Sequence, residues 1–270
     1  MIKFIKIAAF VLLMLPILGG KLYSQNTRYL DDVFLSYNTE SGEYQKDYKY
    51  LLFSPAGDTV KKRPVIIVLH AGGGKLEDVS GWCIDFVKKG YVCITAEYKL
   101  TVGDFNPSEQ KQAVAQIYWL NYWIKQNSER AGLKAKKIFV MGTSAGGITA
   151  LESGMALNDR FTDFFSGYSI PDTRNLYIIG TASMSGAAIP EFNSIINTGD
   201  PPNFFYNGMK DLLIPYKAAE LTYSLQILSG IPSGIVLFPD KGHKLESHDF
   251  ILADLTLRFY YILKPKAGQW

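Results

Sequence analysis

The residue with the clearest potential for chemistry in this sequence is a serine set among glycines. Residues 142–147 read GTSAGG and follow the apolar run KIFVM at residues 137–141. A serine in the pattern G-x-S-x-G, at a turn from a strand into a helix, is lifted above the edge of a sheet, because the glycines permit the sharp turn. The pattern alone has a chance of roughly one in ten of arising by accident, so its position carries the argument. We predict that Ser144 is a nucleophile rather than an idle serine in a Gly-rich turn.

A second glycine-rich loop could stabilise the negative charge that such a nucleophile creates. Residues 70–74 read HAGGG and follow the apolar run at residues 64–69. Attack on a carbonyl leaves negative charge on oxygen, which needs backbone N–H donors that no bulky side chain shields. The N–H of Ala145, at the start of a helix, is expected to add a further donor. A phosphate-binding loop is the alternative, but neither the Walker nor the dinucleotide glycine spacing is met.

A serine hydroxyl needs a base, and the sequence contains only three histidines. His243 follows the last predicted strand, in a loop made flexible by Gly242, so we expect it to reach the nucleophile. His70 lies in the HAGGG loop and is expected to brace it. His248 is expected at the start of the last helix, facing solvent. We therefore predict His243 as the base, with His248 as the alternative.

The base in turn needs an acid to fix its tautomer. Asp211 follows the predicted strand at residues 203–206 and precedes Pro215, which opens the next helix. An aspartate at that edge can reach the neighbouring loop that carries His243. Asp240 is the competitor, but it lies only three residues from His243 and is less well placed to orient the ring. We predict Asp211 as the acid, with a helix-capping role as the alternative.

The elements that must position these residues alternate along the chain. Short apolar runs, typical of strands buried on both faces, are separated by longer amphipathic segments, which predicts βαβ units and a mostly parallel central sheet with helices on both faces. In such a sheet, ligands bind beyond the carboxyl ends of the strands. The strands are expected at residues 48–53, 64–69, 91–96, 137–141, 176–182, 203–206 and 234–238, and the helices at 79–89, 108–126, from 145, 216–228 and 249–263.

The N-terminal residues 1–24 have the build of a secretory signal peptide. Lys3 and Lys6 precede an apolar run, and a cleavage site is expected just after Ser24. The apolar run is shorter than the roughly 20 residues that span a bilayer, so an uncleaved anchor is the less favoured alternative. We expect a secreted or periplasmic protein with residues 25–270 as a single domain and no stable insertion in a membrane after cleavage.

Charge argues against a nucleic acid as the partner. The chain has 28 basic and 25 acidic residues, and residues 1–24 hold three of the lysines and no acid. The remainder is therefore neutral, with 25 of each sign, and shows no basic patch of the kind that nucleic-acid binding requires. Cys83 and Cys93 could pair in an exported protein, but two buried free thiols are favoured. We expect no metal and no organic cofactor.

The motifs together resemble the α/β-hydrolase carboxylesterases with an HGGG-type oxyanion loop, in the hormone-sensitive-lipase-like and feruloyl- or acetyl-esterase-like branch. The resemblance extends from about residue 48 to residue 263 and rests on five segments. The order Ser144, Asp211, His243 is the order of this fold. The segments are residues 70–74, 90–91 with 97–100, 142–147, 207–211 and 241–243.

The resemblance implies a site and a mechanism. Gly72, Gly73 and Ala145 would form the oxyanion hole, and an acyl-enzyme would form on Ser144 without a cofactor. The sequence departs from the family pattern at Ala71, which replaces the first glycine, and at Thr143, where the closest branch usually has Asp. The segment at residues 97–100 (EYKL) also differs from the family's DYRL.

The most probable function on these grounds is hydrolysis of a carboxylic ester, with a small-molecule or carbohydrate ester as substrate. A peptidase of the prolyl-oligopeptidase kind shares the same three residues, but the sequence shows no internal repeat of the kind that a propeller would need. A non-catalytic binding protein of the same fold is a third hypothesis, although such proteins usually lose one of the three. The segment at residues 158–175 could roof the acyl pocket or could be an ordinary packed loop.

Overall fold

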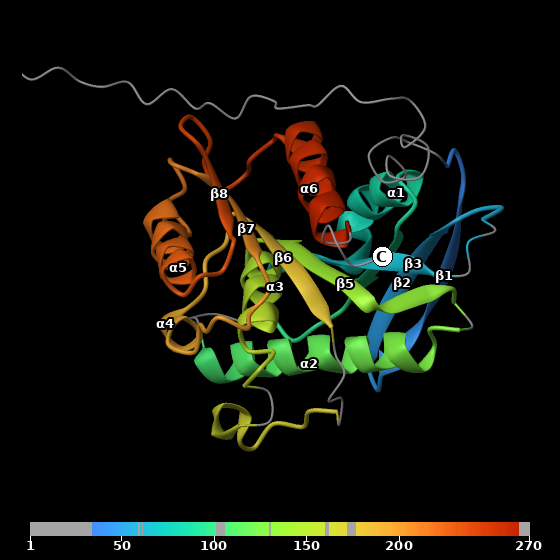
Figure 1. Ribbon diagram of the computed structural model, residues 1–270, viewed down its shortest axis with the longest axis horizontal. Coiled ribbons are helices and arrows are strands. Elements are labelled where there is room, and N and C mark those ends of the chain that lie inside the picture. Colours follow the sequence, from blue (N-terminus) through green and yellow to red (C-terminus); the bar gives the residue numbers. More distant parts are fainter. Residues whose placement is uncertain are drawn as a thin grey trace, which may run out of the picture.

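The computed structural model describes residues 34–58, 60, 62–100, 106–129, 131–159, 162–171 and 177–264. The expected signal peptide at residues 1–24 lies outside the described residues. Within the described part of the chain, one central sheet is covered by helices on both faces (Figure 1). The α/β fold predicted from the alternation of strands and helices is confirmed.

The sheet contains eight strands in the order β1-β2-β4-β3-β5-β6-β7-β8. The strands from β3 onward pair in parallel, whereas β1 pairs antiparallel to β2 and β2 pairs antiparallel to β4. All parallel strands therefore end at one edge, where the loops that follow them meet. The strands are β1 Tyr37–Gln45, β2 Tyr48–Pro55, β3 Arg63–Leu69, β4 Val92–Ala96, β5 Leu133–Thr143, β6 Ile178–Met184, β7 Asn203–Gly208 and β8 Gly234–Phe238.

The helices divide between the two faces of the sheet. α1 (Ser80–Lys88) and α6 (His248–Leu263) cover one face, and α2 (Pro107–Gln126), α3 (Ala145–Met155) and α5 (Tyr216–Leu228) cover the other (Figure 1). Every residue of β3, one of the two central strands, is buried, which explains the continuous apolar sequence that follows Arg63. α4 (Pro190–Asn193) and two 3₁₀ turns, Leu76–Val79 and Asp163–Phe165, complete the described elements.

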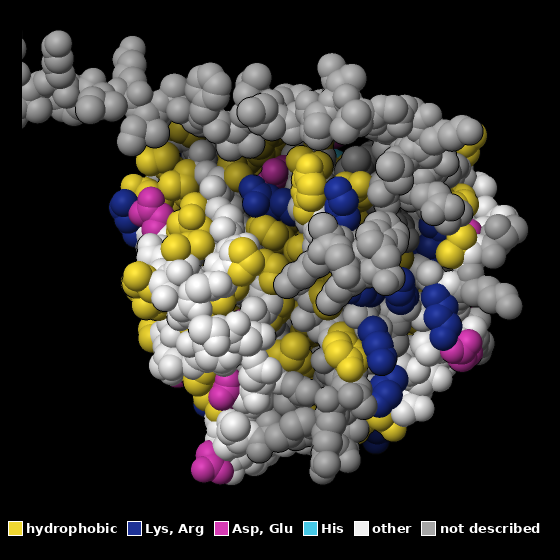
Figure 2. Space-filling model, in the orientation of Figure 1, with side chains coloured by type: hydrophobic (Ala, Val, Ile, Leu, Met, Phe, Trp, Pro, Cys, Tyr) yellow, Lys and Arg dark blue, Asp and Glu magenta, His cyan; other side chains and the backbone are white. Residues whose placement is uncertain are grey.

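The two faces of the sheet have separate apolar cores. Ile67 and Val140 pack toward α2 and α3, whereas Ile66 and Phe139 pack toward α1 and α6. Cys83 and Cys93 belong to the second core and carry free, buried thiols, and burial raises the pKa of Cys93. On the surface, hydrophobic side chains gather over α5, at the left margin of Figure 2. No helix among the described residues has the length and apolar character needed to cross a bilayer.

The predicted elements agree with the structure except at β1, at the start of β5 and at the short helix α4, which was not predicted. β1 was not expected, because most of its residues are polar and exposed. β5 begins at Leu133, four residues before the predicted start of that strand. The segment at residues 158–175 is described at 158–159 and 162–171, and there it packs against α2. Phe165 contacts Tyr118, and Trp119 donates a hydrogen bond to the carbonyl of Ser169.

Candidate active site

The turn from β5 into α3 holds Ser144 in a strained backbone conformation. Ser144 has φ +54°, which a residue with a side chain rarely adopts, and hydrogen bonds on both sides maintain it. Its N–H donates to the carbonyl of Met184 at 2.8 Å, and its own carbonyl accepts from Ile148 at 2.9 Å. The turn projects the hydroxyl beyond the carboxyl edge of the sheet, as predicted for a G-x-S-x-G turn.

The glycines around Ser144 are required by close contacts. A Cβ atom at Gly142 would lie 2.4 Å from the carbonyl carbon of Gly146. A Cβ atom at Gly146 would lie 2.5 Å from the carbonyl oxygens of Leu69 and His70. Side chains at these two positions would therefore separate α3 from the strands against which it packs.

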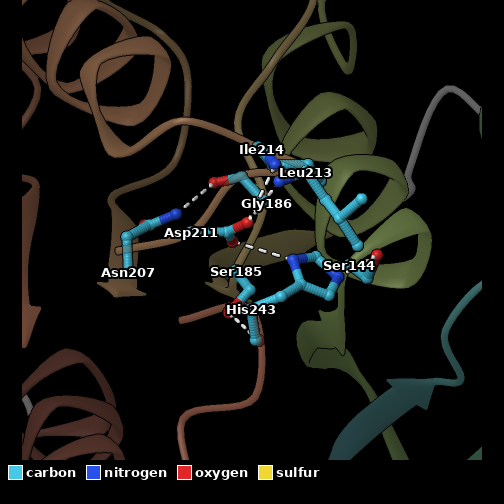
Figure 3. Close-up of polar contacts among 8 residues, drawn as sticks. All are labelled: Ser144, Ser185, Gly186, Asn207, Asp211, Leu213, Ile214 and His243. Carbon is cyan, nitrogen blue, oxygen red and sulfur yellow. Dashed lines mark hydrogen bonds and ion pairs between the residues drawn. The ribbon is translucent and has the colours of Figure 1, made fainter. Parts of the chain in front are cut away.

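The hydroxyl of Ser144 lies within hydrogen-bonding distance of His243. The distance from Ser144 Oγ to His243 Nε2 is 2.9 Å, and His243 Nδ1 lies 2.8 Å from Asp211 Oδ2 (Figure 3). An ionised carboxylate only accepts, so Nδ1 carries a proton and donates it to Asp211. In a neutral ring, Nε2 is then free to accept the proton of the serine. The structure thus brings together the three residues predicted as nucleophile, base and acid.

Asp211 is held rigidly behind the histidine. Its side chain is fully buried, and its second oxygen, Oδ1, accepts hydrogen bonds from the N–H groups of Leu213 at 2.8 Å and Ile214 at 3.0 Å. One oxygen therefore accepts from the backbone, and the other accepts from the imidazole. The competing residue Asp240 is exposed, and no contact between it and His243 is present in the described part of the chain.

Two further residues near the site were not identified from the sequence. The hydroxyl of Ser185 donates to the carbonyl of His243 at 2.7 Å, and Ser185 itself has φ +54° (Figure 3). The side-chain amide of Asn207 donates to the carbonyl of Gly186 at 3.3 Å and connects the end of β7 to the loop after β6. Ser185 lies in no motif, and Asn207 lies in the segment at residues 207–211 without an assigned role, because each acts on backbone atoms distant in the chain.

The HAGGG loop lies beside the start of α3. A Cβ atom at Gly72 would lie 3.7 Å from the Cβ of Ala145, so Gly72 is adjacent to the serine turn. Gly73 has φ +72°, a backbone conformation in which a residue with a side chain would be strained. Gly72 and Gly73 are exposed. Ala145 is the first residue of α3, and the N–H groups of the first turn have no acceptor within the helix. These are the positions predicted for the oxyanion hole.

The other two histidines have distinct environments. His70 is buried, its Nδ1 lies 2.9 Å from the carbonyl of Ala71, and its carbonyl accepts from the hydroxyl of Tyr98. These contacts fit the predicted bracing of the loop. His248 was expected to face solvent, but its Nε2 lies 2.9 Å from Asp85 Oδ2 and its ring packs on Trp82. The side chain is 39% exposed, so it faces solvent in part as expected, but its partners on α1 were not expected.

The described residues contain no group of three or more His, Cys, Asp and Glu side chains arranged to hold a metal ion. A polarised hydroxyl, a base with a fixed tautomer and an adjacent pair of exposed glycine amides are the parts needed for acyl transfer.

Comparisons with known proteins agree with this fold. Residues 52–180, just under half of the chain, match the family model BD-FAE. Esterase 2 of Thermogutta terrifontis phosphorylated by paraoxon is similar to the chain with a TM-score of 0.67 and 20% identity, over 84% of this chain and 96% of that one. The propionate-bound form of that thermophilic esterase gives a TM-score of 0.68 and 20% identity over 85% and 97% of the two chains. No curated protein sequence matches.

Proposed function

We propose that this chain, which has the α/β-hydrolase fold and matches the family model BD-FAE over residues 52–180, is a serine hydrolase that cleaves carboxylic esters. The observation that carries the proposal is the hydrogen-bonded series from Ser144 through His243 to the buried Asp211. A serine alone would be a weak nucleophile, and the series supplies both its base and the group that orients that base.

The reaction proceeds by double displacement. His243 Nε2 takes the proton of Ser144 as Oγ attacks the acyl carbon, and the N–H groups of Gly72, Gly73 and Ala145 stabilise the negative oxygen. The protonated His243 then donates to the alcohol oxygen, which leaves with its proton, and an acyl-enzyme remains on Ser144. Water, deprotonated by His243, releases the acid and restores the serine. Asp211 stays ionised throughout and stabilises the imidazolium.

Hydrolysis of short-chain 4-nitrophenyl esters tests the proposal. The wild-type protein is expected to release nitrophenol, and Ser144→Ala is expected to lose roughly 10³-fold or more in kcat while it keeps its fold. Ser166→Ala is the matched control, since Ser166 is an exposed serine in the segment packed on α2. Equal rates for the wild type and Ser144→Ala would exclude Ser144 as the nucleophile.

We also propose that the natural substrate is a small or carbohydrate ester met outside the cytoplasm. The motif resemblance to acetyl and feruloyl esterases and the signal-like residues 1–24 support this proposal. A panel of acetylated sugars, feruloylated sugars and lipid esters is expected to show highest kcat/KM on the sugar esters. Preference for lipid esters would contradict the substrate class.

Export is tested separately from catalysis. Expression of the full chain in a bacterium is expected to yield protein outside the cytoplasm whose N-terminal sequence begins after Ser24. Recovery of the intact N-terminus in the membrane fraction would favour an uncleaved anchor instead.

A further inference from the structure

An apolar pocket of about 370 Å³ opens beside the proposed nucleophile. Ser144 and His243 lie in its lining, and both helices on one face of the sheet contribute part of the remaining wall. α1 contributes Trp82, and α6 contributes His248 and the buried Ile251. The lining also includes the end of β6 at Met184, so the pocket continues directly from the reacting atoms.

The pocket lies on the side of the site from which the leaving group departs. All residues from His243 to His248 line it, so much of its wall is the segment that carries the base. In the proposed reaction the protonated His243 must face the alcohol oxygen, because it donates the proton with which the alcohol leaves. The group attached to that oxygen is therefore directed along the same segment and into this pocket.

Trp82 is held in the wall by His248, which in turn contacts the carboxyl group of Asp85. The ring of His248 packs on the indole with the ring centroids 3.8 Å apart, and His248 Nε2 lies 2.9 Å from Asp85 Oδ2. Lys88 holds the other oxygen of Asp85 at 3.0 Å. Burial alone would raise the pKa of Asp85. The hydrogen bonds from Lys88 and His248 outweigh burial and hold this pKa below its ordinary value, so the carboxylate stays ionised.

We propose that Trp82 is a specificity-determining residue that limits the size of the alcohol group, and that His248, anchored by Asp85, is the positioning residue that holds the indole in the pocket wall. The inference rests on the proposed ester hydrolysis and adds to it the side of the substrate that is selected. It assigns the pocket to the group attached to the alcohol oxygen, for which Trp82 and Ile251 provide an apolar wall.

Two series of esters separate the alcohol from the acyl side. One series keeps the acetyl group and varies the alcohol from methyl through butyl to octyl and benzyl. The other keeps 4-nitrophenol and varies the acyl group from acetate to octanoate. Trp82→Ala is expected to raise the ratio of kcat/KM for octyl acetate to kcat/KM for methyl acetate by roughly tenfold, because it removes a large side chain from the pocket wall. The order of preference in the acyl series is expected to stay that of the wild type.

The positioning role of His248 has its own readout. His248→Ala is expected to shift the alcohol preference in the same direction as Trp82→Ala, because the indole loses its support. His248→Gln keeps an N–H donor for Asp85 and is expected to restore the wild-type preference in part. Trp119→Ala is the matched control, since Trp119 lies on α2 with its N–H bonded to Ser169, and it is expected to change neither series.

The outcomes distinguish this inference from the proposed function. If the wild type hydrolyses neither series, the ester hydrolysis itself fails. Trp82→Phe is a milder variant that preserves the fold. If the wild type is active and the Trp82 variants change neither series, or change only the acyl series, the assignment of the pocket is overturned. If His248→Ala lowers the melting temperature without any change of alcohol preference, its positioning role is overturned.

Discussion

Asp211 uses its two carboxylate oxygens for different partners, and this division has a consequence for catalysis. Oδ1 accepts from the backbone N–H groups of Leu213 and Ile214, and Oδ2 faces His243. A side-chain amide in the same place would keep its oxygen on the two backbone donors. Its NH₂ group would then point at His243 Nδ1, which would have to accept, so that the ring proton moved to Nε2.

Asp211→Asn is therefore expected to lower kcat/KM by roughly 10³- to 10⁴-fold with little loss of stability, since a proton on Nε2 prevents His243 from accepting that of Ser144. Rates on a 4-nitrophenyl ester and thermal unfolding measure the two effects. Asp240→Asn, at the exposed competitor, serves as the control and is expected to match the wild type. The opposite ranking of the two variants would contradict the assignment of the acid.

The residues of the site differ in how far the sequence predicts them. Ser144, Asp211 and His243 each follow a strand, so the rule that strand ends meet at one edge was enough to group them. Ser185 was not predictable, because it bonds to a backbone carbonyl 58 residues away and lies in no motif. The contacts of His248 were not predicted for a related reason: its partner Asp85 lies on another helix, 163 residues away in sequence.

At the scale of elements, the contact between α3 and the strands β3 and β5 depends on the glycines of the serine turn. Gly146 faces the end of β3, where a methyl group would lie 2.5 Å from two carbonyl oxygens. Backbone atoms cannot yield as a flexible side chain can, so α3 would have to move away from the sheet.

Gly146→Ala is expected to destabilise the protein by about 3 kcal/mol or more, by overpacking at this contact. Gly81→Ala is the control, since a methyl group there meets nothing within 4 Å and Gly81 lies in the exposed first turn of α1. That variant is expected to be stabilising by about 0.4–1 kcal/mol. Chemical denaturation measures both, and equal stabilities for the two variants would contradict the account of the turn.

Strands in the middle of the sheet and the edge strand β8 were predicted from the sequence, whereas the edge strand β1 was not. β3 and β7 are buried along their whole length, and each contains an apolar run. β1 is an edge strand with mostly exposed residues, so its sequence, YNTESGEYQ, has no apolar alternation that would distinguish it from a loop. Its pairing with β2 becomes apparent only from the backbone hydrogen bonds.

At the scale of the whole molecule, one buried carboxyl group links stability to pH. Glu152 on α3 is completely buried, and burial raises its pKa to about 8, although a hydrogen bond from the N–H of Ile189 opposes the change. The folded protein therefore keeps Glu152 protonated at pH values where the unfolded chain has already lost that proton. Stability from this group is full below the unfolded pKa and falls as the pH rises through the folded pKa of about 8.

Glu152→Gln is expected to remove this dependence, because the amide stays neutral and its oxygen can still accept from Ile189. Between about pH 5 and about pH 8, the free energy of unfolding of the wild type is expected to fall by about 3 kcal/mol relative to the variant. Denaturation across this range measures the difference, with Glu77→Gln, at an exposed position, as the control. Parallel pH profiles for the wild type and Glu152→Gln would contradict the assignment.

The mostly parallel sheet with helices on both faces was predictable because alternation of strands and helices permits few topologies. The alcohol side of the substrate was not predictable, since its pocket joins Trp82 of α1 to Ile251 of α6, which only the fold brings together. Which two helices lie side by side on one face of a sheet has no signal in local sequence.

The central claim, that His243 activates Ser144 for covalent chemistry, is tested most directly by intact mass measurement after reaction with a fluorophosphonate. Attack by Ser144 Oγ would form an oxygen–phosphorus bond and expel fluoride, which leaves a stable adduct. We expect one adduct per chain, on the peptide that contains Ser144, with none in Ser144→Ala and much slower labelling in His243→Ala. A folded wild-type protein that takes no label, or takes it on another residue, would contradict the claim.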